Sequence, residues 1–198
     1  MDIENPKMVL QKSLEDSCGL STYIKTIDIY NIDVSKDVEF QKTFTSYYKV
    51  RRDKTWLNKY YEYLENHKNN KDLTFEDVIR YLSSIPHKVN KSISATGFAS
   101  TVEASFASKL LSTINPDFPV WDSQVVKALG YKVEFNGSFE ERIEAHIKAY
   151  SDLTAEVKEF IASEQGKTCI QLFDELFPNH IHISDLKKID FYLWNLGK

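Results

Sequence analysis

The chain has 198 residues, which is enough for one large domain or two small ones. Of these residues, 42% are apolar and 27% are charged, so the chain can bury a core and has an ordinary share of charge. Its formal net charge is −4. This balance removes the simplest argument for nucleic-acid binding, which is a strongly basic chain, but it leaves room for a local basic patch.

Cysteine usage and hydropathy point to a reducing, aqueous compartment. Cys18 and Cys169 lie far apart in the chain and form no C-x-x-C pair, so we expect reduced thiols rather than a disulfide framework. The charged N-terminal stretch lacks the apolar run of a signal peptide. No segment approaches the ~20 apolar residues of a transmembrane helix. We expect a cytoplasmic protein with no membrane partner.

Helical spacing of apolar residues recurs through the first half of the chain. It predicts helices over residues 6–17, 21–32, 37–50, 54–66 and 74–85. Alternating apolar residues over 26–34 also suit a strand, and both interpretations stay open there. Thr74 and Asp77 have the spacing of a capping box, and Pro86 ends that helix. The polar, Ser-rich segment that follows is the longest link in the chain.

The second half continues the same pattern. The S-x-x-E spacing predicts capping boxes at Ser100 and Ser138, and Asp122 is positioned to begin a helix after a Pro-bounded turn. Further helices are predicted over 152–163, 168–176 and 184–196. We therefore expect an all-α, globular multi-helix domain over 1–198 with roughly nine or ten helices. Two helical subdomains that divide near 86–98 are one alternative, and a core shared by helices from both ends is another.

The helix predicted after Ser100 contains an unusual set of small residues, which are Ala104, Ser105, Ala107 and Ser108. Small side chains let another backbone approach closely, so we expect this helix to be central and tightly packed.

A basic and aromatic stretch lies between Lys42 and Lys59, where six basic residues stand against one acid. Basic side chains meet phosphates and aromatic rings stack on bases, so the stretch is a candidate nucleic-acid contact. The favoured alternative is a pair of amphipathic helices with solvated basic faces and buried aromatics. The candidate phosphate-binding residues are Lys49, Arg51, Arg52 and Lys54.

Two shorter patterns do not support a site. EQGKT, at 164–168, lacks the first glycine of a phosphate loop because position 161 is Ile, so we interpret Gly166 as a helix C-cap. His180 and His182 form at most half of a metal site, and a loop between helices is favoured. We expect no metal and no cofactor.

The strongest functional pattern lies between Gly97 and Gly130. A helix of small residues and a short turn precede Pro119-Val120-Trp121-Asp122-Ser123, and the next helix ends in Ala128-Leu129-Gly130. This order resembles the helix-hairpin-helix superfamily of base-excision DNA glycosylases.

The resemblance implies an all-α fold, DNA as the partner and Asp122 as the catalytic carboxylate. It places Trp121 and Ser105 as base-pocket candidates. Further candidate DNA contacts lie before and at the start of the small-residue helix, at Gly97, Ser100 and Thr101.

The sequence departs from the family pattern in several places. The family's hairpin reads G-x-G, whereas only Gly97 is present here. The position of the nucleophilic lysine of bifunctional members falls near Ser105, with Lys109 a turn later. No cysteine cluster resembles the family's iron–sulfur loop. The missing lysine favours a monofunctional hydrolase over a Schiff-base lyase.

Asp122 has a chemical and a structural interpretation. N-glycosidic cleavage passes through an oxocarbenium-like sugar, which a nearby carboxylate stabilises while it orients or deprotonates a water molecule. The target base first leaves the stack and enters a pocket. Asp is also among the best N-cap residues, and the pattern needs nothing more than a cap. The rival hypothesis is a non-catalytic helical module that binds nucleic acid or protein, such as a degenerate relative of the same fold.

Overall fold

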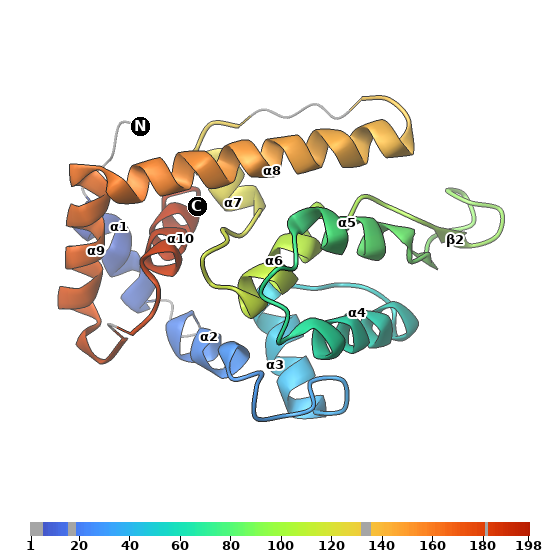
Figure 1. Cartoon of the computed structure of the whole chain (residues 1–198), viewed down its shortest axis with the longest axis horizontal. Coiled ribbons are helices and arrows are strands. Elements are labelled where there is room, and N and C mark those ends of the chain that lie inside the picture. The colour runs from blue at the N-terminus through green and yellow to red at the C-terminus, as the bar shows by residue number, and fades with distance from the viewer. Residues whose placement is uncertain (1–5, 16–18, 132–135, 181) are drawn as a thin grey trace. The chain divides into compact units, whose positions relative to one another are not determined.

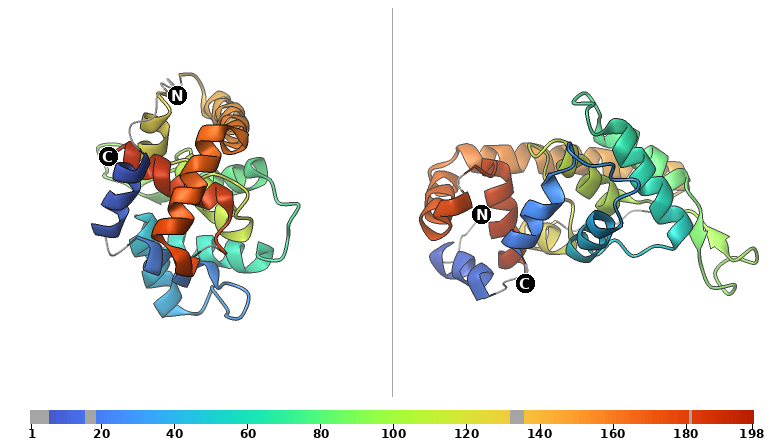
Figure 2. Two further views of the ribbon diagram at one scale, coloured as in Figure 1. Left: turned by 90° about the vertical axis from the view of Figure 1, so that its left-hand side faces the viewer. Right: turned by 90° about the horizontal axis from the view of Figure 1, so that it is seen from below.

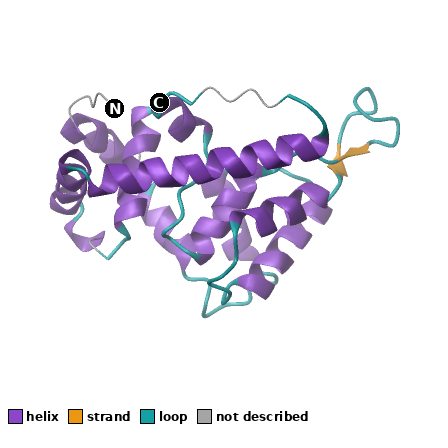
Figure 3. Ribbon diagram, turned by 45° about the horizontal axis from the view of Figure 1, so that its top comes forward, coloured by secondary structure: helices purple, strands orange, loops and turns teal. Residues whose placement is uncertain are grey.

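The computed structural model describes residues 6–15, 19–131, 136–180 and 182–198 (Figure 1). Over these ranges the chain is predominantly α-helical, with ten α-helices, one 3-10 helix and two short strands (Figure 3). The predicted all-α class is confirmed at this level. Within the same ranges, no helix combines the length and the apolar character that crossing a membrane requires.

Loops connect the helices and strands along the chain. The first half contains α1 (Pro6–Glu15), α2 (Leu20–Ile27), α3 (Val38–Tyr48), α4 (Lys54–His67), α5 (Phe75–Ser84), β1 (His87–Lys88) and β2 (Phe98–Ala99). The second half contains α6 (Ala104–Ile114), α7 (Ser123–Ala128), α8 (Phe139–Ala162), α9 (Glu164–Leu176), the 3-10 helix η1 (Pro178–His180) and α10 (Asp185–Leu196).

Local capping explains several helix starts. Thr74 with Asp77, and Ser138 with Glu141, form the two reciprocal capping boxes that the sequence predicts. Asp122 caps α7, also as predicted. Each such side chain satisfies backbone N–H groups that the first turn leaves unpaired, which typically stabilises a helix by about 1 kcal/mol.

The capping box predicted at Ser100 is wrong. Helix α6 begins at Ala104, its N-cap is Glu103, and no side chain caps its first turn. The Glu103 carboxylate does not reach back to Ser100, because it is bound by Arg52 from the segment before α4. A long-range ion pair has replaced the local hydrogen bond that the motif predicts.

Three further predictions are corrected. Helix α2 ends at Ile27 and no strand follows over 28–34. The helices predicted on either side of Ser151 are one continuous helix, α8. Gly166 is not a C-cap: it lies in the first turn of α9, where an added Cβ would meet the Phe160 carbonyl oxygen. Glycine is needed there because two backbones approach closely.

The chain forms two compact units. The terminal unit contains α1 and the described residues from Pro116 onward, and the central unit contains residues 19–115. Neither boundary falls at 86–98, where the chain instead forms a β-hairpin inside the central unit.

Each unit has its own apolar core. In the terminal unit, α10 packs against α1, α7, α8 and α9, and its Ile189, Tyr192 and Leu193 are fully buried. In the central unit, α6 packs against α2, α4 and α5, while Phe44, Trp56 and Tyr60 form part of an aromatic cluster. The small-residue helix α6 is therefore central within its unit, as its composition predicts.

Candidate functional site

Asp122 lies at the N-terminus of α7 in the terminal unit. Its backbone is extended, and its Oδ1 accepts a hydrogen bond from the Gln124 N–H at 2.9 Å. The side chain is half-buried. The cap confirms the structural interpretation of this residue, and it also fixes the carboxylate in one orientation.

The turn before Asp122 is anchored to α8. The Tyr150 hydroxyl donates to the Pro119 carbonyl at 2.8 Å. The Trp121 ring packs edge-on against Tyr131 and His146, with 6.3 Å between ring centroids in both pairs. Trp121 is only 9% exposed, so its main role within this unit is to hold the turn.

His146 supplies a neutral ring beside Trp121. Its Nδ1 donates to the Arg142 carbonyl at 2.7 Å, which fixes the proton on that nitrogen when the ring is neutral. Burial is the main cause that lowers the pKa of His146 below its ordinary value. The imidazole is therefore uncharged at neutral pH.

A second acid, Asp190 of α10, belongs to the same neighbourhood. Burial raises its pKa from 3.8 to about 6, the charge of Lys187 and the Val120 N–H lower it, and the negative charge of Asp122 raises it. The Lys187 ammonium lies 3.5 Å from Asp190 Oδ2, while Oδ1 is buried with no hydrogen-bond partner among the described residues. The charge of Asp122, at the start of α7, thus acts on the buried Asp190 carboxyl group of α10.

Sequence reasoning missed Asp190. The available signal was a carboxyl group directly between the apolar residues Ile189 and Phe191 of the last helix. A charged residue in such a position is buried or faces a site, and burial needs a compensating partner.

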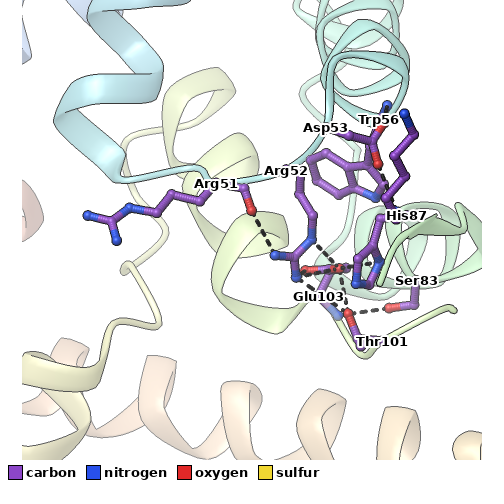
Figure 4. Close-up of polar contacts among 9 residues, drawn as sticks. Arg51, Arg52, Asp53, Trp56, Ser83, His87, Thr101 and Glu103 are labelled. Atoms are coloured by element: carbon purple, nitrogen blue, oxygen red, sulfur yellow. Dashed lines mark hydrogen bonds and ion pairs between the residues drawn. The ribbon is translucent and has the colours of Figure 1, made fainter. Parts of the chain in front are cut away.

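The basic stretch in the central unit divides into two kinds of residue. Lys49, Arg51 and Lys54 are exposed, and Lys49 ends α3 with a positive φ of 55°. Arg52 instead donates to both oxygens of Glu103, at 2.8 to 3.0 Å, and its guanidinium lies 4.8 Å from the Phe106 ring. Figure 4 shows Arg51 directed away from this cluster.

Arg52 and Glu103 form a clamp that also involves Thr101. Glu103 is 3% exposed, and it accepts a hydrogen bond from the Thr101 hydroxyl at 2.7 Å. The Ser83 hydroxyl accepts from the Glu103 backbone N–H (Figure 4). This geometry gives Arg52 and Thr101 a structural role that joins α4, α5 and α6.

The aromatic part of the stretch follows the amphipathic-helix alternative. Trp56 is fully buried and stacks on Tyr60, and Tyr48 is also buried. These rings therefore belong to the core of the central unit rather than to a stacking surface for bases.

The remaining candidates lie around the hairpin. Gly97 has a φ of 75°, and its N–H donates to the Ser94 carbonyl at 2.9 Å, so this N–H is already used within the loop. Ser100 is exposed just after β2. Ser105 lies in the first turn of α6, half-buried, in the central unit, whereas Trp121 belongs to the terminal unit.

No group of three His, Cys, Asp or Glu residues among those that the structure describes could hold a metal ion. His180 lies in the 3-10 helix η1 and its ring centroid is 6.2 Å from that of His182.

Comparisons with known proteins add no neighbour to this description. No protein-family model, curated protein or solved structure matches the chain.

Proposed function

We propose that the protein is a helix-hairpin-helix-type DNA glycosylase that hydrolyses an N-glycosidic bond, with Asp122 as the catalytic carboxylate. The observation that carries the proposal is the half-buried Asp122 carboxylate, which is held by the helix cap and whose charge acts on the buried Asp190. The resemblance of the surrounding residues to the glycosylase superfamily supplies the reaction class.

The cap and the proposed chemistry are compatible. The Gln124 N–H holds Oδ1, which gives the carboxylate a single orientation without removing its negative charge. A preorganised charge stabilises a developing oxocarbenium ion more effectively than a mobile one, because no reorganisation is needed during the reaction.

Asp190 supports the proposal electrostatically. Its raised pKa lets it keep a proton to higher pH than an ordinary aspartate. Paired carboxyl groups whose environments separate their proton affinities are the usual arrangement for acid and base roles in glycoside hydrolysis.

The reaction balances with one water molecule. The bond between the base nitrogen and C1′ breaks with its electron pair on the base, and the water oxygen bonds to C1′. One water proton is taken up by a carboxylate, and the departing base is protonated in turn. Asp122 would stabilise the positive sugar and orient the water.

The test is Asp122→Asn. Asn caps a helix as well as Asp does, so the fold is retained while the charge is lost. We expect base release from duplexes that each carry one damaged or mismatched base to fall about 100-fold or more. Release is measured as strand cleavage at abasic sites after alkali treatment, and Ser123→Ala is the matched control.

Two outcomes would contradict the proposal. Undiminished base release by Asp122→Asn would remove Asp122 from the chemistry. DNA binding by the wild-type protein without release from any of these duplexes would favour the non-catalytic binding module.

A further inference from the structure

The β1–β2 hairpin is the most prominent projection of the central unit. It extends beyond the helices of that unit in Figure 1 and in the right-hand view of Figure 2. Its base is fixed, because the Lys88 N–H donates to Asp53 Oδ2 at 2.9 Å and the neighbouring His87 is buried.

The strand register gives the hairpin two different faces. Lys88 is paired with Phe98, and His87 with Ala99. Paired residues lie on the same face of a two-stranded ladder, and successive residues alternate between faces. His87 and Ala99 therefore face the unit, while Lys88 and Phe98 face outward. Phe98 is 48% exposed.

The loop at the tip is held by its own hydrogen bonds. The Val89 N–H donates to the Gly97 carbonyl at 2.9 Å, and the Ile93 N–H donates to the Asn90 carbonyl at 2.8 Å. Ile93 is nevertheless 72% exposed at this ordered tip. An ordered loop presents its exposed apolar side chains without a large entropic penalty on binding.

The hairpin itself carries basic residues and no acidic ones. The sequence contains no Asp or Glu between Asp77 and Glu103, and the hairpin exposes Lys88 and Lys91. The acid at its base, Asp53, accepts hydrogen bonds from the N–H groups of Lys88, Thr55 and Trp56. The same contact brings the hairpin base next to a segment that exposes Arg51 and Lys54.

We propose that this hairpin binds an unpaired stretch of DNA. Phe98 stacks on one exposed base, and Lys88 and Lys91 contact the adjoining phosphates. An exposed aromatic ring paired across the strands with a lysine matches the base and phosphate of one nucleotide, and such stacking tolerates any base. The inference rests on the proposed function, because a glycosylase must hold DNA whose pairing has been broken.

The test compares binding of a fluorescently labelled single-stranded oligonucleotide and of its perfect duplex by anisotropy at low salt. We expect Phe98→Ala and Phe98→Leu each to weaken binding of the single strand about tenfold, with a smaller effect on the duplex. We expect Lys88→Gln with Lys91→Gln to weaken both and to reduce the salt slope by about 2.

Matched controls come from the same unit. Val38, on α3, is an exposed apolar residue outside the hairpin, and Lys71 is an exposed lysine between α4 and α5. Val38→Ala and Lys71→Gln should leave both affinities unchanged. Equal thermal unfolding curves for all variants would show that the fold is retained.

Three outcomes would overturn the inference. The first is no binding of either oligonucleotide by the wild-type protein, and the second is unchanged affinities in the hairpin variants. The third is full binding by Phe98→Leu with loss in Phe98→Ala, which would indicate a general apolar contact in place of ring stacking. Base release by the wild-type protein and its loss in Asp122→Asn decide the proposed function separately, whichever way the hairpin variants behave.

Discussion

Among the residues that the structure describes, each unit buries one acid, and the two acids have different surroundings. In the central unit, Glu103 is bound by the Arg52 guanidinium through both carboxylate oxygens and by a Thr101 hydroxyl. In the terminal unit, Asp190 has the Lys187 ammonium at 3.5 Å from Oδ2 and the Val120 N–H as a further donor, while its buried Oδ1 has no hydrogen-bond partner among the described residues. Glu103 is a satisfied structural ion, whereas Asp190 keeps an unusual proton affinity.

The difference between Glu103 and Asp190 distinguishes a carboxyl group with a structural role from one suited to proton transfer. A buried charge whose hydrogen-bonding capacity is filled stabilises one arrangement of the chain. An incompletely paired carboxyl group responds instead by a raised pKa, which is common at sites of proton transfer. Asp190 fits the second case.

The largest effect should come from breaking the clamp. Arg52→Met keeps much of the side-chain volume but leaves Glu103 buried without its cation, which typically costs about 3 kcal/mol or more. We expect the free energy of unfolding, measured by urea denaturation at pH 7, to fall by that amount. Arg51→Met is the matched control, since Arg51 is exposed one residue earlier, and it should change stability by less than about 0.5 kcal/mol. Equal losses in the two variants would refute a structural role for the clamp.

The second prediction concerns the pH dependence that Asp190 confers. In the folded protein Asp190 keeps its proton up to about pH 6, whereas its ordinary pKa is 3.8. The native state therefore binds more protons between these values, and the free energy of unfolding decreases as the pH rises through them. The contribution is complete below about pH 4 and lost above about pH 6, and it amounts to about 2 to 3 kcal/mol.

Asp190→Asn should remove this dependence. Urea denaturation between pH 4 and 7 would show a flatter stability profile than that of the wild type, with a gain in stability at pH 7. Glu159→Gln, an exposed position on α8, should leave the wild-type profile unchanged. A profile for Asp190→Asn that parallels the wild type would mean that Asp190 titrates normally.

Sequence reasoning succeeded where a structure depends on neighbouring residues. Thr74 and Ser138 cap their helices through bonds that span three residues, so the motif contains all the information. The Asp122 cap was predictable for the same reason. The order of the helices followed from apolar spacing, because one buried stripe is sufficient to define a helix.

Sequence reasoning failed where the residue that determines the local structure is distant in the chain. Glu103 has the spacing of a capping box, yet its partner Arg52 lies 51 residues earlier and no local pattern reveals that. The burial of Asp190 depends on how α10 packs into the core of the terminal unit, which no local pattern predicts. The hairpin was likewise missed, since strands of two residues are too short for alternation to show.

The smallest predicted effect comes from comparing the capping box at Thr74, which is present, with the one predicted at Ser100, which is not. Thr74→Ala removes the side chain that accepts the Asp77 N–H, so we expect a loss of about 1 kcal/mol in the free energy of unfolding. Ser100→Ala removes a side chain that caps no helix, and we expect a change of less than about 0.5 kcal/mol. Both variants lie in the central unit, so urea denaturation compares them against one background.

A loss at Ser100 as large as that at Thr74 would show that Glu103 is shared between the local cap and the Arg52 clamp. A negligible loss would mean that the clamp alone determines where Glu103 lies, and hence where α6 begins.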